Sequence, residues 1–339
     1  MRSFCRLLHS AVSEHLRASL HPNLHPPLVT HTTRPQNKIM ETKQSRDLHR
    51  MEVISFLRRN GIIQSWEITH PPHGTGNETY FVQSNNGQSY FVKLGAQTDR
   101  YQVMSKLGLS PPIITIGYLE DGTSILVQQR INGKKPSRKD FQLHLKKFAE
   151  SIKTTHQCGQ LKQILPKRSS TFYKDVGLEI LEEIEQRWKK CESQVPLFTE
   201  YVNEKITYLK NQVDQFMDGG LVASHNDICN GNWLVSSDEK LYLLDYESMA
   251  LDDPALDLGA ILWWYYPPEM WEKFLQIAGY DNDESFRNRM RIRMAIHNLN
   301  IIIPREKSFD RFTAETFEEA LVDFRAVIDG KENPQGYND

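Results

Sequence analysis

Hydrophobic and polar residues alternate with a period of two in short runs between residues 62 and 131. This period is typical of half-buried strands. Turn residues between successive runs predict two hairpins, the second turning at Asp121 and Gly122. A helical period precedes the runs and stops at Gly61, and another short helix is expected over residues 99–112. The pattern therefore predicts a small antiparallel sheet with one or two helices.

Beyond Gly133 the apolar residues recur with the helical spacing of 3.6 residues. The clearest helical stretches are residues 138–157, 178–194 and 255–266, and helices are expected to continue to about residue 329. One predicted strand pair, residues 232–237 and 240–246, interrupts them. We therefore expect an α+β fold with two lobes: a small antiparallel β N-lobe over residues 51–133 and a larger helical C-lobe over residues 134–339.

The first fifty residues differ from the rest, because residues 20–38 are rich in Pro, His and Thr and have no hydrophobic period. We interpret residues 1–50 as a disordered extension, of which residues 1 to about 45 contribute nothing to the core. The Arg-containing first twenty residues could also be a transit peptide.

Composition narrows the class of protein. The chain has 339 residues, a mass of 39.5 kDa and a net charge of −2, which argues against a generally basic nucleic-acid binder. It has no run of eighteen apolar residues, so no membrane span is expected. Its four cysteines form no C-x-x-C pair, which favours reduced thiols in a cytoplasmic protein over a disulfide framework or zinc site.

The spacing of three polar residues around the predicted strand pair indicates a catalytic site. Asp227 follows His225 by two residues, Asn232 lies five residues after Asp227, and Asp245 comes at the end of the next hairpin. This order matches the kinase signature H-R-D-L-x-x-x-N followed by D-F-G. Phosphoryl transfer needs one carboxylate for the attacking hydroxyl, and an amide oxygen and second carboxylate for Mg²⁺. We predict Asp227 as the base and Asn232 and Asp245 as Mg²⁺ ligands, with His225 bracing the loop.

Two features of the N-lobe fit ATP binding. Gly74 and Gly76 lie in a turn between strands, where backbone N–H groups can approach phosphates. Lys93 lies in the third predicted strand, as the lysine of the kinase V-A-I-K motif does. The alternatives are an ordinary hairpin turn and a solvated lysine at a sheet edge.

The segment after Asp245 argues against a protein kinase. No Gly follows the aromatic residue, and about a dozen residues separate Asp245 from the next predicted helix. That leaves no room for a peptide-binding activation segment, so a small-molecule hydroxyl is the expected acceptor.

From about residue 60 to residue 275 the chain resembles the aminoglycoside phosphotransferase and choline/ethanolamine kinase superfamily, which has a protein-kinase-like fold. The stretches that carry the resemblance are HGTGNETYFV, ILVQQRINGKK, HNDICNGN, LLDYE and DDPALDLG. It implies that Asn77 belongs to the nucleotide loop, that Lys93 binds the ATP phosphates and that backbone near Gln129 meets the adenine. It also implies that Asp257 is mainly structural. The N-lobe would then bind nucleotide, and the C-lobe would hold the catalytic and acceptor sites.

HND and DYE favour the choline-kinase branch, in which Glu247 would lie near an amine substrate, although that branch often has Gln where this chain has Cys229. Trp264 and Tyr265 are candidates for an aromatic cage around a quaternary ammonium; the alternative is a buried helix that is apolar on all sides. The acidic segment from Asp245 to Asp257 could attract a cationic substrate, or consist of metal ligands and a solvated loop.

We therefore expect an ATP- and Mg²⁺-dependent kinase of a small, cationic, choline- or ethanolamine-like hydroxyl compound, with no nucleic-acid or membrane partner. Within the enzyme class, the alternative is a kinase of an aminoglycoside or other antibiotic, a sugar or a vitamin. From another class, a non-catalytic nucleotide-binding pseudokinase remains open. The pattern leaves the oligomeric state undetermined.

Overall fold

A computed structural model describes residues 48–62, 66–69, 78–84, 87–217, 219–304 and 313–338. The predictions for Gly74, Gly76, Asn77 and most of the 1–50 extension lie outside these residues, although residues 48–50 already belong to a helix. The chain forms two compact units: Met1–Thr98 with Pro111–Ile131, and Asp99–Ser110 with Asn132–Asp339.

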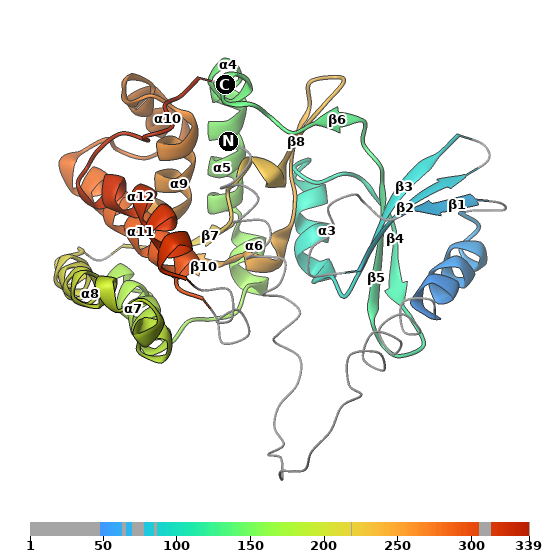
Figure 1. The fold of residues 1–339 in the computed structure, drawn as a ribbon. Coiled ribbons are helices and arrows are strands. Elements are labelled where there is room, and N and C mark those ends of the chain that lie inside the picture. The colour runs from blue at the N-terminus through green and yellow to red at the C-terminus, as the bar shows by residue number, and fades with distance from the viewer. Residues whose placement is uncertain are drawn as a thin grey trace, which may run out of the picture. The chain divides into compact units, whose positions relative to one another are not determined.

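The first unit is built on a five-stranded antiparallel sheet with the order β1-β2-β3-β5-β4 (Figure 1). Its strands are β1 (Trp66–Thr69), β2 (Thr79–Ser84), β3 (Ser89–Leu94), β4 (Ile113–Tyr118) and β5 (Ser124–Gln129). Both predicted hairpins form, because β2 pairs with β3 and β4 with β5.

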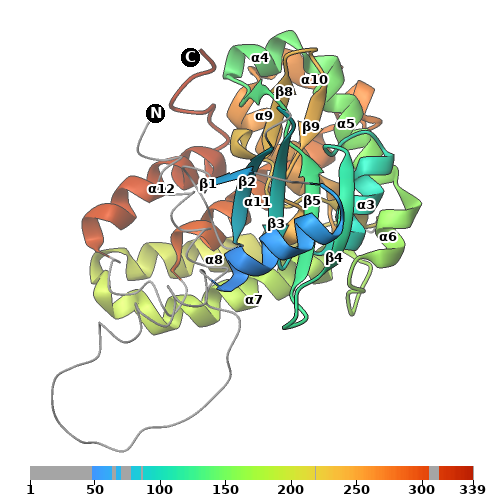
Figure 2. The same ribbon diagram turned by 90° about the vertical axis from the view of Figure 1, so that its right-hand side faces the viewer.

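A helix through residues 48–59 lies across one face of this sheet (Figure 2). Its apolar side buries Val53, Phe56 and Leu57 against Tyr80 and Val92 of the central strands. The helix ends where Gly61 adopts a φ of 68°, a left-handed conformation that glycine takes without steric cost. The apolar period of this segment is therefore what attaches it to the sheet.

Helix α3 (Thr98–Lys106) groups with the second unit from Asp99 onward, although the expected boundary placed it in the N-lobe. Its buried residues include Arg100 and Tyr101. The sequence pattern predicts a helix here. It does not show what the buried side of the helix packs against, because those residues lie more than a hundred positions away.

The second unit is mainly helical. Besides α3, its described α-helices are α4 (Arg138–Leu143), α5 (Leu145–Gln157), α6 (Gly159–Ile164), α7 (Tyr173–Cys191), α8 (Thr199–Val213), α9 (Pro254–Tyr265), α10 (Trp271–Ala278), α11 (Glu284–Ile302) and α12 (Ala314–Ile328). The helix expected over residues 138–157 is broken at His144, which ends α4 and precedes α5. Among the described helices, none has both the length and the apolar character that a membrane span requires.

Two small sheets accompany these helices. One has the order β6-β8-β9 and contains β6 (Gly133–Lys134), β8 (Trp233–Ser236) and β9 (Leu241–Leu243). The other pairs β7 (Val222–Ser224) antiparallel with β10 (Ala250–Asp252). The strand pair β8–β9 was expected, whereas the very short β6, β7 and β10 were not, because two or three residues carry no readable period.

Helices α9 and α11 pack closely because Gly259 has no side chain. A Cβ atom at this position would lie 2.8 Å from the Met290 carbonyl oxygen. We expect Gly259→Ala to force the helices apart and lower the free energy of unfolding by about 1–3 kcal/mol in urea denaturation. Gly159→Ala is the control, since a Cβ there meets nothing within 4 Å. Equal losses in the two variants would contradict the close packing.

Candidate active site

The segment between β7 and β8 begins with a histidine that ties it to the following hairpin. His225 is fully buried, and its Nε2 lies 3.0 Å from the Leu244 carbonyl oxygen. A carbonyl can only accept, so Nε2 donates this hydrogen bond. This contact fits the bracing role expected for His225.

Asp257, in the first turn of α9, holds the same segment from behind. Its carboxylate accepts hydrogen bonds from the backbone N–H groups of His225 at 2.7 Å and Asn226 at 2.9 Å. His156 Nε2 lies 3.1 Å from it. Burial raises the pKa of Asp257, but hydrogen bonding and charge from His156, followed by the charge of His225, outweigh burial and lower it. Asp257 is thus a buried structural anion, in the role that the resemblance implied.

Asp227 and Asn232 meet through the Asn232 side chain. Its Nδ2 donates to the Asp227 backbone oxygen and to Asp227 Oδ2, both at 2.8 Å. Since Nδ2 makes these bonds, the amide Oδ1 stays available as an oxygen ligand. The spacing of five residues therefore brings the predicted base and one predicted metal ligand together.

Asp245 lies beside this pair at the end of the β8–β9 hairpin. The Leu244 N–H donates to the Asn232 carbonyl oxygen at 2.7 Å, and Asp245 is the next residue. Asp245 itself has a φ of 65°, and left-handed backbone at a non-glycine residue costs on the order of 1–3 kcal/mol. The prediction that the hairpin brings Asp245 back to the loop agrees with this connection.

The oxygen donors of this site suit Mg²⁺. Asn232 and Asp245 offer an amide oxygen and a carboxylate, and Mg²⁺ in phosphotransferases is bound by one or two such groups together with substrate phosphates. Among the described residues, no cluster of three or more His, Cys, Asp or Glu side chains forms a cage for a metal. The donor set therefore fits an ion that arrives with the nucleotide.

The acidic segment after Asp245 is mostly buried and paired. Asp252 Oδ1 accepts from Arg293 Nη2 at 2.5 Å and Asp253 Oδ2 lies 3.1 Å from Arg289 Nε. Together with Asp257, these carboxylates are at most 2% exposed. Charges that are buried have to be paired. These carboxylates therefore form neither a solvated loop nor an open surface that attracts cations. Both interpretations of this part of the segment were wrong.

Glu247 lies in a 3₁₀ turn (Tyr246–Ser248), not on a continuing strand. The Tyr101 hydroxyl lies 3.2 and 3.3 Å from its two carboxylate oxygens. Arg100 Nη1 donates to the carbonyls of Tyr246 and Glu247 at 2.7 and 3.0 Å. Strand alternation therefore does not orient Glu247, and α3 holds this turn instead. No sequence pattern marked Arg100 or Tyr101 for this role.

Tyr265 supports the catalytic segment from α9. Its hydroxyl accepts the Asn230 N–H at 2.7 Å, and its ring stacks on Phe141 with centroids 4.0 Å apart. Trp264 is partly buried and packs edge-on against Trp263. One face of the Tyr265 ring is thus covered. The buried-helix alternative describes α9, since eleven of its residues are buried.

In the first unit, Lys93 and Gln129 belong to neighbouring strands. Lys93 lies in β3, between β2 and β5, and is 6% exposed. The alternative of a solvated edge lysine is therefore wrong. Gln129 ends β5, and its backbone N–H already donates to the Pro112 carbonyl at 2.9 Å. An adenine at this position would have to use another backbone group.

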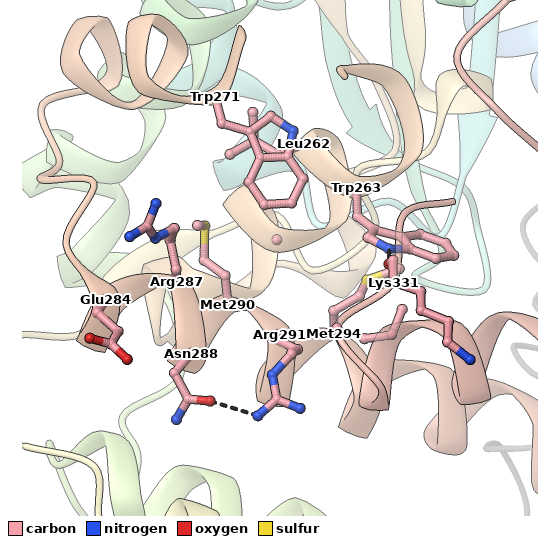
Figure 3. Close-up of a pocket in the computed structure, with 13 residues that line it drawn as sticks. Leu262, Trp263, Trp271, Glu284, Arg287, Asn288, Met290, Arg291, Met294 and Lys331 are labelled. Carbon is pink, nitrogen blue, oxygen red and sulfur yellow. Dashed lines mark hydrogen bonds between the residues drawn. The ribbon is translucent and has the colours of Figure 1, made fainter. Parts of the chain in front are cut away.

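A cavity of about 310 Å³ opens between α9, α11 and the end of α12 (Figure 3). Trp263, Trp271 and Met294 form part of its apolar lining, and Arg287 and Arg291 of α11 lie at its side. None of the predicted catalytic or metal-binding residues is among the described residues that line it. This cavity is therefore separate from the predicted catalytic residues.

Comparison with known proteins gives the family and the fold. The sequence model of the phosphotransferase enzyme family matches residues 67–290. The structure is similar to the choline kinase LicA from Streptococcus pneumoniae, with a TM-score of 0.56 and 16% identity over 83% of this chain and 98% of that one.

Two further structures show the same similarity. The choline kinase from Cryptosporidium parvum Iowa II has a TM-score of 0.59 and 15% identity over 82% of this chain and 96% of its own. A thermostable mutant of the aminoglycoside phosphotransferase APH(4)-Ia, in complex with ADP and hygromycin B, has a TM-score of 0.59 and 13% identity over 81% and 96%. The prediction of an α+β, protein-kinase-like fold is confirmed.

Proposed function

Since this chain belongs to the phosphotransferase enzyme family, we propose that it transfers the γ-phosphoryl group of Mg·ATP to a hydroxyl of a small, cationic molecule, such as a choline- or ethanolamine-like amino alcohol. The proposal is supported mainly by one observation: Asp227, Asn232 and Asp245 lie on two segments that are joined by hydrogen bonds. These are the groups that phosphoryl transfer requires.

Asp227 has the central role. Its carboxylate orients the acceptor hydroxyl and accepts the proton as the hydroxyl oxygen attacks the γ-phosphorus and the bond to the β-phosphate oxygen breaks. Asn232 holds one carboxylate oxygen at 2.8 Å, so the other can face the acceptor. His225 and Asp257 keep the loop in place through its backbone. ADP and the phosphorylated acceptor are the products.

Asn232 Oδ1 and the Asp245 carboxylate would hold Mg²⁺. The ion neutralises charge on the phosphates when it is bound. The small-molecule assignment is supported by the short segment between Asp245 and Pro254, where α9 begins. A cationic acceptor is supported by Glu247 and by the choline kinases among the similar structures.

The metal assignment can be tested with Asp245→Ala. We expect this change to weaken Mg·ATP binding by about tenfold or more, because a metal ligand is lost, and to remove the difference in ATP affinity between Mg²⁺ and EDTA solutions. Asp245→Asn tolerates the same left-handed backbone and separates the lost charge from backbone strain. A variant that still binds ATP more tightly with Mg²⁺ than with EDTA would contradict the assignment.

The function as a whole can be tested by measuring ADP formation with purified protein across amino alcohols, aminoglycosides and sugars. We expect Mg²⁺-dependent turnover with an amino alcohol. The aminoglycoside alternative is supported by the similarity to the hygromycin B complex, and would show turnover with an aminoglycoside alone. Nucleotide binding without turnover of any acceptor would favour the pseudokinase alternative.

A further inference from the structure

Three basic residues recur at four-residue steps along α11: Arg289, Arg293 and His297. Residues at this spacing lie on one side of a helix. The first two members each meet an acidic partner, Arg289 with Asp253 and Arg293 with Asp252. His297 is therefore the next residue along a side of α11 that faces the acidic segment.

The register of the β7–β10 pair shows where this side of α11 leads. Asp252 lies opposite Val222 and Ala250 lies opposite Ser224, after which the chain continues into His225 and the catalytic segment. From Asp253, the partner of Arg289, to Asp252, the partner of Arg293, the chain runs back into β10, whose other end lies opposite Ser224. His297 lies one further turn along α11, about 6 Å beyond Arg293. Consistent with this position, the Asp227 carboxylate acts electrostatically on His297.

His297 differs from the two arginines because none of the described residues makes a hydrogen bond or ion pair with it. Within the described residues, neither ring nitrogen of His297 makes a hydrogen bond, and the side chain is partly buried. Burial lowers the pKa of His297, and Arg293 adds to this, against the opposing charges of Asp227, Asp257 and Asp252. A neutral imidazole has one N–H donor and one nitrogen acceptor. Within the described residues, both remain available to an acceptor.

We propose that His297 contacts the acceptor and selects molecules that carry an N–H or second O–H group near the hydroxyl that is phosphorylated. This inference rests on the proposed function, since Asp227 marks where that hydroxyl must lie. A primary amine or a polyol can hydrogen-bond to the free imidazole nitrogen. A quaternary ammonium such as choline has no N–H and would leave this nitrogen without a partner, which a polar site penalises. Ethanolamine-like or aminoglycoside-like acceptors are thus favoured over choline.

The experiment compares ethanolamine with choline, which differ in the methylation of the amine, and includes kanamycin as an aminoglycoside. The variants are His297→Leu, which removes both polar atoms, and His297→Gln, which keeps a donor and an acceptor. His144→Leu is the control, because His144 makes no side-chain hydrogen bond in the described structure. Values of kcat and KM for each acceptor and for ATP are measured for all proteins.

We expect the wild type to prefer an N–H-bearing acceptor to choline by tenfold or more in kcat/KM. His297→Leu should raise KM for that acceptor about five- to hundredfold, as expected when a buried hydrogen bond is lost, and leave KM for ATP unchanged. His297→Gln should retain most of the preference. A second readout is the NMR signal of the His297 ring in ¹³C-labelled protein, which should shift when ethanolamine is added but not when choline is added. This measurement uses the wild type, so it tests the inference even if His297→Leu does not fold.

The inference is overturned if the wild type prefers choline, or if His297→Leu changes KM equally for ethanolamine and choline. It is also overturned if the His297 ring signal does not shift when ethanolamine is added. In those cases acceptor turnover persists and the proposed function stands. If no acceptor is turned over, the proposed function itself fails and the inference fails with it.

Discussion

Asp227→Asn should lower kcat by about 10²–10⁴-fold, the usual contribution of a general base, while ATP affinity stays within about twofold of the wild type. The carboxamide can still accept the hydrogen bond from Asn232 Nδ2 through its own oxygen, so the loop keeps its shape. The carboxamide cannot, however, take the proton of the acceptor hydroxyl. The effect should therefore be confined to the chemical step.

The measurement is steady-state ADP formation together with nucleotide binding by calorimetry. Asp281→Asn is the control, since Asp281 is exposed and lies outside the segments that form the site. Wild-type turnover in Asp227→Asn would show that another group is the base. Loss of ATP binding would show that Asp227 belongs to the nucleotide site instead.

Asp257→Ala should lower the free energy of unfolding by about 3–5 kcal/mol, the range for removing one partner of a buried charged pair. The change leaves the buried N–H groups of His225 and Asn226 without their acceptor, and His156 without its carboxylate. Turnover should fall as well, because these N–H groups position the loop that carries Asp227. Asp257→Asn, which retains an acceptor oxygen, should show a smaller loss in urea denaturation. A loss below 1 kcal/mol in the alanine variant would contradict the anchoring role.

The same residue predicts a dependence of stability on pH. The pKa of Asp257 is lowered in the folded protein from its ordinary value of 3.8. Its contribution to stability is therefore complete above the unfolded-state pKa and is lost as the pH falls through the lower, folded-state pKa. Wild-type protein should lose more stability than Asp257→Ala when the pH is lowered from 5 through this acid range. Parallel curves for the two proteins would contradict this prediction.

Local patterns account for the parts of the fold that could be predicted. The strands of the first unit follow from alternation over four to six residues. Gly61 after the first helix and Gly122 in the turn between β4 and β5 both adopt positive φ angles. The long helices of the second unit follow from their apolar period. The break at His144 and the three-residue strands β7 and β10 were missed, since so few residues show no period and depend on distant partners.

The candidate site divides in the same way. Asp227, Asn232 and Asp245 were found from spacing, because a tight loop followed by a hairpin returns the chain to its own start within twenty residues. The roles of Asp252 and Asp253 were misread, because their arginine partners on α11 lie 41 and 36 residues further along. Only the four-residue spacing of Arg289, Arg293 and His297 could have drawn attention to that helix.

By itself, the sequence determined the alternation of strands and helices, the order of the catalytic residues and the resemblance to a kinase superfamily, since each depends on neighbours along the chain. The tertiary structure alone decided which carboxylates are buried as structural anions, where Glu247 and Tyr265 find their partners, and that His297 follows Arg293 towards the catalytic segment. The physical reason is that burial and hydrogen-bond partners depend on contacts between residues far apart in the chain, whereas periodicity and turn chemistry depend on residues within a few positions of one another.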